Sequence, residues 1–389
     1  MTFIKNLFVG LLSFLLFLSL TIFGLAFMLR STVLNPDFVT SELNRIEIAA
    51  LLDEFLYMDS PADSPDFNGI IIDAASNIEP EVKEQLSLGI HSTYDYLLGE
   101  TRQPEVKLIL RNTFLNADFV TSLFDNIDLS SLAVFYINQQ FVKDIPFEID
   151  NLDEYIANAV TSAEPAIKKQ IVAVSEPVFD YLLMDSRTLD AAISLEEIKG
   201  HLSETILQIF LDSPPPELAV IPRNQRELFF NQFYQDFADM VPSEFRLTHD
   251  IFDKELPADI AAGIASAEEA LQQTRQYVEY FQLGYTVLLI FIVLLGLGIV
   301  LIIRDVKITS RYLGIPLLSY GAVEYAGTLI GKYFSKGQLP ASDMPPELNI
   351  WVIQFINNAV KPLEIFSLSL LIGGAILIVI SFVYKRSDS

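Results

Sequence analysis

The chain has 389 residues, a formal net charge of −25 and no cysteine, and 51% of its residues are hydrophobic. This apolar share is high for a soluble protein, so the composition predicts membrane-spanning segments. The absence of cysteine excludes disulfide bonds, iron–sulfur ligation and thiol chemistry, and the acidic balance argues against nucleic acid as a partner.

The first apolar run lies near the N-terminus, between residues 7 and 29. At 1.5 Å per residue it is long enough to cross about 30 Å of hydrocarbon. Cleavable signal peptides have a shorter apolar core and small residues at the cleavage site, whereas this run ends in Phe27-Met28-Leu29-Arg30. We therefore expect residues 1–30 to form an uncleaved transmembrane anchor.

The middle of the chain contains an internal repeat. Residues 32–41 read TVLNPDFVTS and residues 113–122 read TFLNADFVTS, and the blocks at 79–85 and 95–98 recur 85 residues later. The spacing predicts a duplicated domain rather than a solenoid. Its expected parts are a first repeat at 31–111, a second repeat at 112–195, and a cap with a stalk helix at 196–278.

Apolar residues within the repeats recur three and four positions apart, as Val82, Leu86 and Ile90 do. This spacing is typical of amphipathic helices, and the best strand signal, at residues 69–72, is short. We therefore expect a duplicated, all-α domain. Its last helix should run without a break from about residue 260 into the next apolar run.

Two sets of residues hold equivalent positions in the two repeats: Asn35, Asp37 and Phe38 in the first, and Asn116, Asp118 and Phe119 in the second. An Asn or Asp ahead of a helix caps its first turn, and the phenylalanine that follows packs into the core. We expect this structural role for both sets. A ligand cleft between two pseudo-symmetric repeats is the functional alternative.

The acidic charge belongs almost entirely to residues 31–278, which hold 43 Asp and Glu against 15 Lys and Arg. A solvated surface explains this charge, and a basic partner is the alternative. The acidic loops at 59–66 and 144–153 make Ca²⁺ an alternative to solvation, but neither has the ligand spacing of an EF-hand. We expect no cofactor.

Three further apolar stretches follow, at residues 285–303, 312–331 and 365–384, within a C-terminal membrane domain at 279–389. The middle stretch contains Pro316, Glu324 and four glycines, so neighbouring helices would have to shelter it. We expect four spans, because otherwise about 60 residues of apolar character would need another way to be buried. Three spans, with the C-terminus outside, are the alternative.

Glu324 is the candidate functional residue within the membrane, because a carboxylate at mid-span is costly and usually faces a partner or water. Gly327 and Gly331 form a GxxxG pair, which predicts a close helix contact. Residues 348–360 carry apolar side chains on one face. They predict an interfacial helix, or a helix packed on the base of the external domain.

The basic residues favour a cytoplasmic N-terminus, because Lys5, the loop at 304–311 and the tail after residue 384 then lie inside. Residues 31–278 would lie outside the cytoplasm. The expected location is the cell membrane, plasma or inner, with several spans in the lipid bilayer.

Three short sequences carry a resemblance: Asn35-Pro36-Asp37-Phe38 after the anchor, Tyr96-Leu97-Leu98 at a helix end, and ISLEEIK at 193–199. Residues 1–278 thereby resemble uncharacterised prokaryotic membrane-anchored proteins with helical ectodomains, which imply no function. One span, a large external domain and three more spans are similar in layout to permease subunits of MacB/FtsX-type systems. The duplication is not part of that family's pattern.

No metalloprotease, hydrolase or nucleotide-binding motif accompanies the three histidines. We therefore expect a non-enzymatic integral membrane protein whose external domain binds a protein partner or supports a complex of the cell envelope. The alternatives are a transport or mechanotransmission subunit, as the permease-like layout implies, and an envelope hydrolase.

Overall fold

The computed structural model describes residues 2–52, 65–131, 134, 152–212, 214, 218–240, 243–248, 255–338 and 346–383. The chain divides into two compact units. Unit 1 contains Met1–Ile46, Ile90–Pro104 and Ala270–Ser389, and unit 2 contains Glu47–Gly89 and Glu105–Glu269. Each unit is therefore built from segments that are distant in the sequence.

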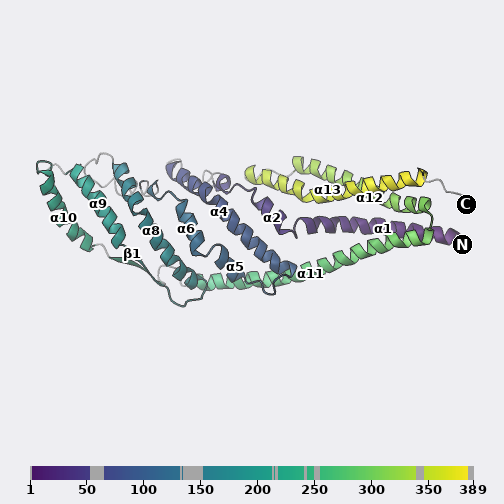
Figure 1. Ribbon diagram of the computed structural model, residues 1–389, viewed down its shortest axis with the longest axis horizontal. Helices are drawn as coiled ribbons and strands as arrows, with labels where there is room; N and C mark the ends of the chain where they lie inside the picture. Colours follow the sequence, from purple (N-terminus) through teal and green to yellow (C-terminus); the bar gives the residue numbers. More distant parts are fainter. Residues whose placement is uncertain are drawn as a thin grey trace. The chain divides into compact units, whose positions relative to one another are not determined.

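Helices dominate the described residues of both units (Figure 1). The elements up to residue 182 are α1 (Thr2–Ser31), α2 (Pro36–Leu43), α4 (Pro65–Leu98), α5 (Val106–Thr113), α6 (Ala117–Asp125) and α8 (Leu152–Leu182). The later elements are β1 (Asp190–Ser194), α9 (Glu196–Asp212), α10 (Arg223–Met240), β2 (Glu244–Thr248), α11 (Leu256–Ile303), α12 (Val306–Gln338) and α13 (Pro346–Val383).

Four of the described helices are long and apolar enough to cross a membrane. The qualifying segments are Leu7–Ser31, Leu256–Ile303, Val306–Phe334 and Leu348–Val383. The third segment lies in α12, which stays helical for 33 residues although it contains Pro316. The predicted class, a mainly α protein with about four transmembrane helices, is confirmed.

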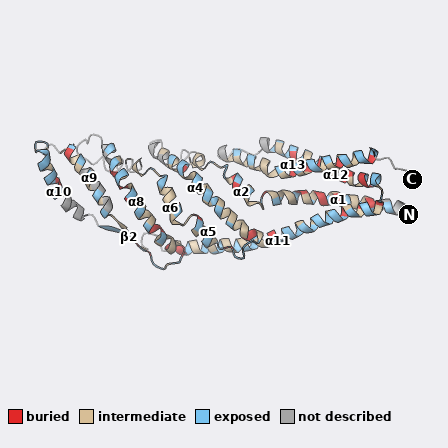
Figure 2. Ribbon diagram, viewed as in Figure 1, coloured by how far each residue is buried: buried red, intermediate tan, exposed pale blue. Residues whose placement is uncertain are grey.

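The core of unit 1 lies where its apolar helices meet. The buried residues are Val9, Leu16 and Leu20 of α1, Leu295, Ile299 and Ile303 of α11, and Tyr320 of α12. Other large apolar side chains of the same helices are exposed, as the pale blue stretches of α11 in Figure 2 show. Exposed apolar surface of this extent is unfavourable in water and suits a lipid environment.

Helices α12 and α13 come into backbone contact at glycines. A Cβ atom added to Gly321 would lie 2.4 Å from the backbone nitrogen of Leu371, and one added to Gly374 would lie 2.4 Å from that of Leu318. Only a residue without a side chain allows this approach. Small residues at helix contacts are typical of membrane bundles, where packing rather than the hydrophobic effect drives association.

Gly327 and Gly331 make no close contact with another described helix of this chain. No atom of another described element lies within 4 Å of a Cβ atom added at either glycine. A helix contact at this pair stays a prediction. The close contacts of α12 use Gly314 and Gly321 instead, which lie on another face of the helix.

Unit 2 contains a row of helices and a small two-stranded sheet. Helix α6 packs on α8, α8 on α9, and α9 on α10 (Figure 1). Strands β1 and β2 are antiparallel, with Ala191 opposite Leu247, and β1 shares a buried cluster with Val174 and Tyr181 of α8. Residues 69–72, which carried the best strand signal of the sequence, belong to α4. A short isoleucine run has no period that separates strand from helix.

Arg111 connects α5 to the end of α8. Its guanidinium donates hydrogen bonds to Asp180 at 2.6 Å, Glu176 at 2.5 Å and Asp185 at 3.0 Å. The bonds to Asp180 and Glu176 raise the pKa of Arg111 above its ordinary value. Lys107 also contacts Asp185, at 2.6 Å. One cationic face of α5 is thus held against three carboxylates.

The two sequence repeats begin with similar helix caps. The Asn35 side chain accepts a hydrogen bond from the amide of Asp37 at 3.0 Å, and the Asn116 side chain accepts one from the amide of Phe119 at 2.8 Å. Both asparagines precede a short helix, α2 in unit 1 and α6 in unit 2. Each satisfies an amide that the first turn leaves unpaired.

The later repeat blocks end their helices in the same way. Gly99 after α4 and Met184 after α8 both have positive φ, 93° and 58°. The amide that follows each of them bonds back to the carbonyl of Asp95 or Asp180, at 2.7 and 2.8 Å. The local structure is therefore similar in both blocks. Superposition of the two complete repeats stays a prediction.

Helix α11 is 48 residues long and has no break between Leu256 and Ile303. Its first part, to Glu269, belongs to unit 2, and the part from Ala270 belongs to unit 1. The expected continuous helix into the second span matches this element.

Candidate functional site

Tyr320 and Glu324 of α12 form the polar centre of the helices in unit 1. They lie four residues apart and so project from neighbouring positions on one helix face. Tyr320 is only 2% exposed, and its hydroxyl has no hydrogen-bond partner among the described residues. A buried hydroxyl without a partner costs about 1–3 kcal/mol, so its retention needs a reason.

Residues of α1 and α13 enclose the tyrosine ring. A Cβ atom added to Gly24 of α1 would lie 1.9 Å from the hydroxyl oxygen, so Gly24 leaves the space that this group fills. Phe366 of α13 packs edge-on against the ring, with centroids 6.0 Å apart. The hydroxyl therefore sits where α1, α12 and α13 meet.

The depth of Glu324 follows from the charges on either side of it in α12. Lys332 lies 21 positions after Arg311, which corresponds to about 32 Å of helix and matches the thickness of the hydrocarbon layer. Glu324 lies eight residues before Lys332, about 12 Å along the helix. Its half-buried carboxylate thus lies within the predicted apolar layer.

An ion pair between α12 and α13 marks one boundary of this layer. The ammonium of Lys332 contacts the carboxylate of Glu364, and both side chains are about three-quarters buried. Glu364 directly precedes the long apolar run of α13. At the boundary of the hydrocarbon layer, burying a pair of opposite charges costs less free energy than burying a single charge.

A second polar cluster in unit 1 surrounds Glu42 of α2. Its side chain is 3% exposed. One carboxylate oxygen accepts a hydrogen bond from Asn358 at 3.0 Å, and the backbone carbonyl accepts one from the indole of Trp351 at 2.7 Å. Phe38 packs against Phe355, with ring centroids 5.9 Å apart. Trp351, Phe355 and Asn358 all belong to the first half of α13.

Residues 348–360 form the first part of α13, which continues through Pro362, and they pack on α2. An interfacial position of this segment stays a prediction.

Sequence analysis missed Glu42, although the repeat contained a signal. At the offset of 81 residues its counterpart is Leu123, so an acidic residue stands where the second repeat has an apolar one. A carboxylate at a position where the pattern requires an apolar side chain is buried at a cost, so it indicates a specific hydrogen-bonding partner. Here the partner is Asn358, more than 300 residues away in the chain.

The repeat residues do not form one site. Asn35, Asp37 and Phe38 belong to unit 1, whereas Asn116, Asp118 and Phe119 belong to unit 2. Phe119 is 7% exposed and Phe38 is half-buried, and Asp37 lies 3.7 Å from the imidazole of His91.

The described residues contain no group of three or more His, Asp and Glu side chains that could hold a metal ion. Most of the acidic loops considered for Ca²⁺, residues 59–64 and 144–151, lie outside the described residues. Calcium binding there stays an untested alternative.

The fold and this polar centre define a multi-pass, mainly α-helical membrane protein. The chain matches no protein-family model, no curated protein and no solved structure. Its function therefore has to be argued from its own residues.

We expect Glu324→Leu to raise the thermal stability of the full-length protein in detergent. Insertion scales give a charged side chain at mid-helix a cost of about 2.5–3.5 kcal/mol, and leucine is favourable there. A residue retained for function rather than stability should behave in this way. The thermal midpoint, followed by loss of the monodisperse peak in size-exclusion chromatography, measures the effect.

Val323→Leu is the matched control, because Val323 is 65% exposed on the same helix and already apolar. Its midpoint should stay unchanged, as should that of Glu324→Gln. A lower midpoint for Glu324→Leu would show that the carboxylate contributes to folding and would remove the argument for a functional role.

Proposed function

We propose that this protein is a non-enzymatic component of the cell membrane, plasma or inner, whose acidic helical domain binds a protein partner of the envelope. In this proposal the N-terminus is cytoplasmic and residues 31–278 lie outside. The positions of Lys5, Arg304, Lys307 and Arg311 support this orientation, because basic residues favour the cytoplasmic side.

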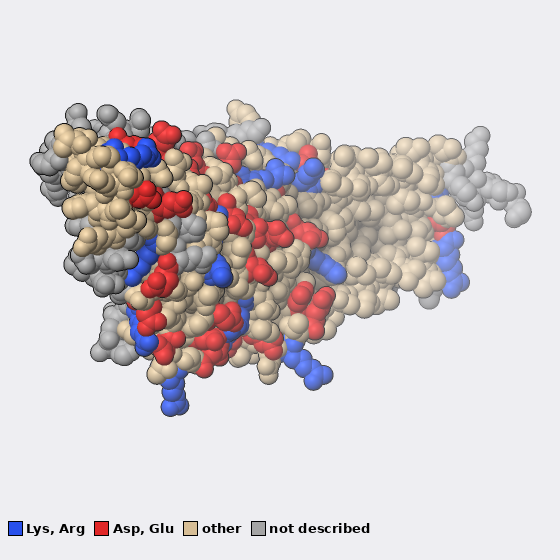
Figure 3. Space-filling model, turned by 60° about the vertical axis from the view of Figure 1, so that its left-hand side comes forward, with Lys and Arg blue, Asp and Glu red and all other residues tan. Residues whose placement is uncertain are grey.

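The distribution of charge supports a membrane part and a solvated part. On the face shown in Figure 3, a wide region carries no Lys, Arg, Asp or Glu, whereas acidic side chains are dense elsewhere. Residues 31–278 alone hold 43 acidic against 15 basic residues. Such a surface favours partners with a basic surface and repels nucleic acid.

The observation that carries the proposal is apolar surface in the first turns of α10 and in the turn before it, in unit 2. Val220 is 86% exposed, Leu228 is 70% exposed and Phe229 is 51% exposed. The next residue, Phe230, is buried against Phe210 of α9, which fixes the orientation of the helix. Exposed aromatic and aliphatic side chains within a charged surface are typical anchors of protein interfaces.

We expect Leu228→Glu combined with Phe229→Glu to reduce partner recovery about tenfold, because apolar anchors dominate binding energy and a carboxylate in their place would have to be desolvated when the partner binds. The full-length protein is purified from its native membranes in mild detergent, and co-purifying proteins are quantified by mass spectrometry.

The matched control is Leu108→Glu, which adds a charge at another exposed leucine of unit 2, 48% exposed on α5. Recovery of partners should be unchanged in this variant. Equal recovery from wild type and from the α10 variant would reject α10 as the docking surface.

Continuous helix α11 favours one second candidate, a transmission subunit of a transport complex. A single helix carries residues of unit 2 and an apolar segment of spanning length without a break. Movement at one end of such a helix would reach the other end. The same purification distinguishes this candidate, because a transport complex should contain an ATP-binding cytosolic protein.

A further inference from the structure

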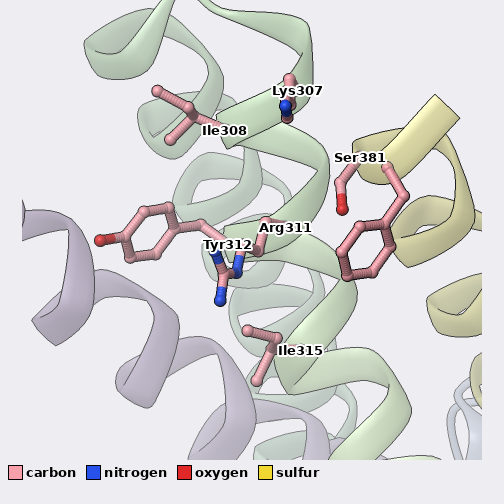
Figure 4. A pocket seen from close by; sticks show the side chains of 7 residues that line it. Lys307, Ile308, Arg311, Tyr312, Ile315 and Ser381 are labelled. Carbon is pink, nitrogen blue, oxygen red and sulfur yellow. The ribbon is translucent and has the colours of Figure 1, made fainter. Parts of the chain in front are cut away.

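A pocket lies between the start of α12 and the end of α13, both in unit 1 (Figure 4). Its volume is about 660 Å³. Basic groups from Lys307 and Arg311 line it together with the apolar side chains of Ile308, Ile315 and Phe382. A site that combines two cations with an apolar wall suits a ligand that is anionic at one end and apolar at the other.

The two cations are positioned to act together. Lys307 and Arg311 are four residues apart on α12, so they lie one turn apart on the same face. Both are exposed, and neither forms an ion pair with a described residue. The nearby carboxylate of Asp305 accepts a hydrogen bond from the amide of Ile308 at 3.0 Å and so caps the helix. The positive charges are therefore open to a ligand.

Two further polar side chains, Tyr312 and Ser381, line the pocket. Neither carries a charge. The hydroxyl of Ser381 donates a hydrogen bond to the carbonyl of Ile378 at 2.8 Å. The charged donors that can face an anionic ligand thus come from the two basic side chains. A guanidinium can bind two oxygens of one phosphate, and an ammonium adds a point charge.

The position of the pocket selects the class of ligand. Lys307 is the second residue of α12 and Phe382 is the second-last residue of α13, so the pocket lies at the end of two apolar helices. This is the level of lipid headgroups when the helices span the bilayer. Free phosphate would satisfy the cations and leave Ile315 and Phe382 uncovered.

We propose that this pocket binds an anionic phospholipid, with its phosphate between Lys307 and Arg311 and an acyl chain along Ile315 and Phe382. The preference of basic residues for the cytoplasmic side explains their charge, but it does not explain why they line a pocket with an apolar wall. The site is independent of the proposed partner at α10. Either can be absent without the other.

The test measures lipid binding to the full-length protein. Protein in neutral detergent is titrated with phosphatidylglycerol, with phosphatidylcholine or with inorganic phosphate, and bound lipid is counted by native mass spectrometry. We expect phosphatidylglycerol to bind, and Lys307→Gln combined with Arg311→Gln to weaken this binding at least about tenfold. Phosphatidylcholine should bind weakly to both proteins.

The control is Arg304→Gln combined with Lys361→Gln, which removes the same charge from residues that do not line the pocket. Its affinity for phosphatidylglycerol should equal that of wild type. Equal losses in both double variants would overturn the proposal, because charge alone would then explain binding. Displacement of the lipid by millimolar phosphate would also overturn it.

A measurement on the wild-type chain covers the case in which the double variant does not fold. Photoactivatable phosphatidylglycerol is crosslinked to the protein, and the modified peptides are identified. Adducts should concentrate in residues 306–315 and 378–383. An even distribution over all four apolar helices would contradict a specific site.

Discussion

Gly321→Val is expected to separate α12 from α13 and to prevent most molecules from reaching the native bundle. A Cβ atom at this position would lie 2.4 Å from the nitrogen of Leu371, 2.6 Å from the carbonyl oxygen of Ser367 and 2.7 Å from the Cα atom of Leu371. All three are backbone atoms, so no side chain can rotate to make room. We expect a loss above about 4 kcal/mol, in the range of exceptional single substitutions.

The control for this prediction is Gly327→Val on the same helix, where no described atom lies within 4 Å of an added Cβ. Both variants make the same chemical change, so only the local space differs. The yield of monodisperse protein and its thermal midpoint should fall sharply for Gly321→Val and remain near wild type for Gly327→Val. Similar losses would mean that Gly327 meets a partner, as its GxxxG motif suggested.

The transmembrane helices could be predicted from the sequence because their signal is local. An apolar run of about 20 residues identifies a span without knowledge of its neighbours. The apolar run predicted at 285–303, for example, forms the C-terminal part of α11. The stretch at 312–331 was harder, because Pro316 and Glu324 weaken its signal. Its place in a 33-residue helix against α13 supplies the missing shelter.

The contacts between helices could not be predicted, because they depend on how each helix is rotated about its axis. The GxxxG motif pointed to Gly327 and Gly331, whereas Gly314 and Gly321 face α13. All four glycines are equally visible in the sequence. Only the position of the partner helix decides which of them is indispensable.

Long-range pairs were missed for a related reason. Strand β1 pairs with β2 more than 50 residues later, and neither has a strong alternating pattern of its own. The Glu42 contact with Asn358 spans an even longer separation. Sequence patterns describe a residue's own element. The exception at Glu42 indicates that a partner exists, but no pattern identifies which distant residue it is.

Phe119→Ala is expected to destabilise unit 2 by about 3–5 kcal/mol, the usual cost of removing a buried phenylalanine. Phe119 is 7% exposed and packs edge-on against Phe114, with centroids 5.5 Å apart. Its amide also donates the hydrogen bond that Asn116 accepts as the cap of α6. The matched variant Phe38→Ala should cost less, because Phe38 is half-buried at the equivalent repeat position. Hydrogen exchange of α6 and α8 in the full-length protein measures the loss of protection. Unchanged exchange in Phe119→Ala, or an equal effect of both variants, would contradict the assignment of Phe119 to the core of unit 2.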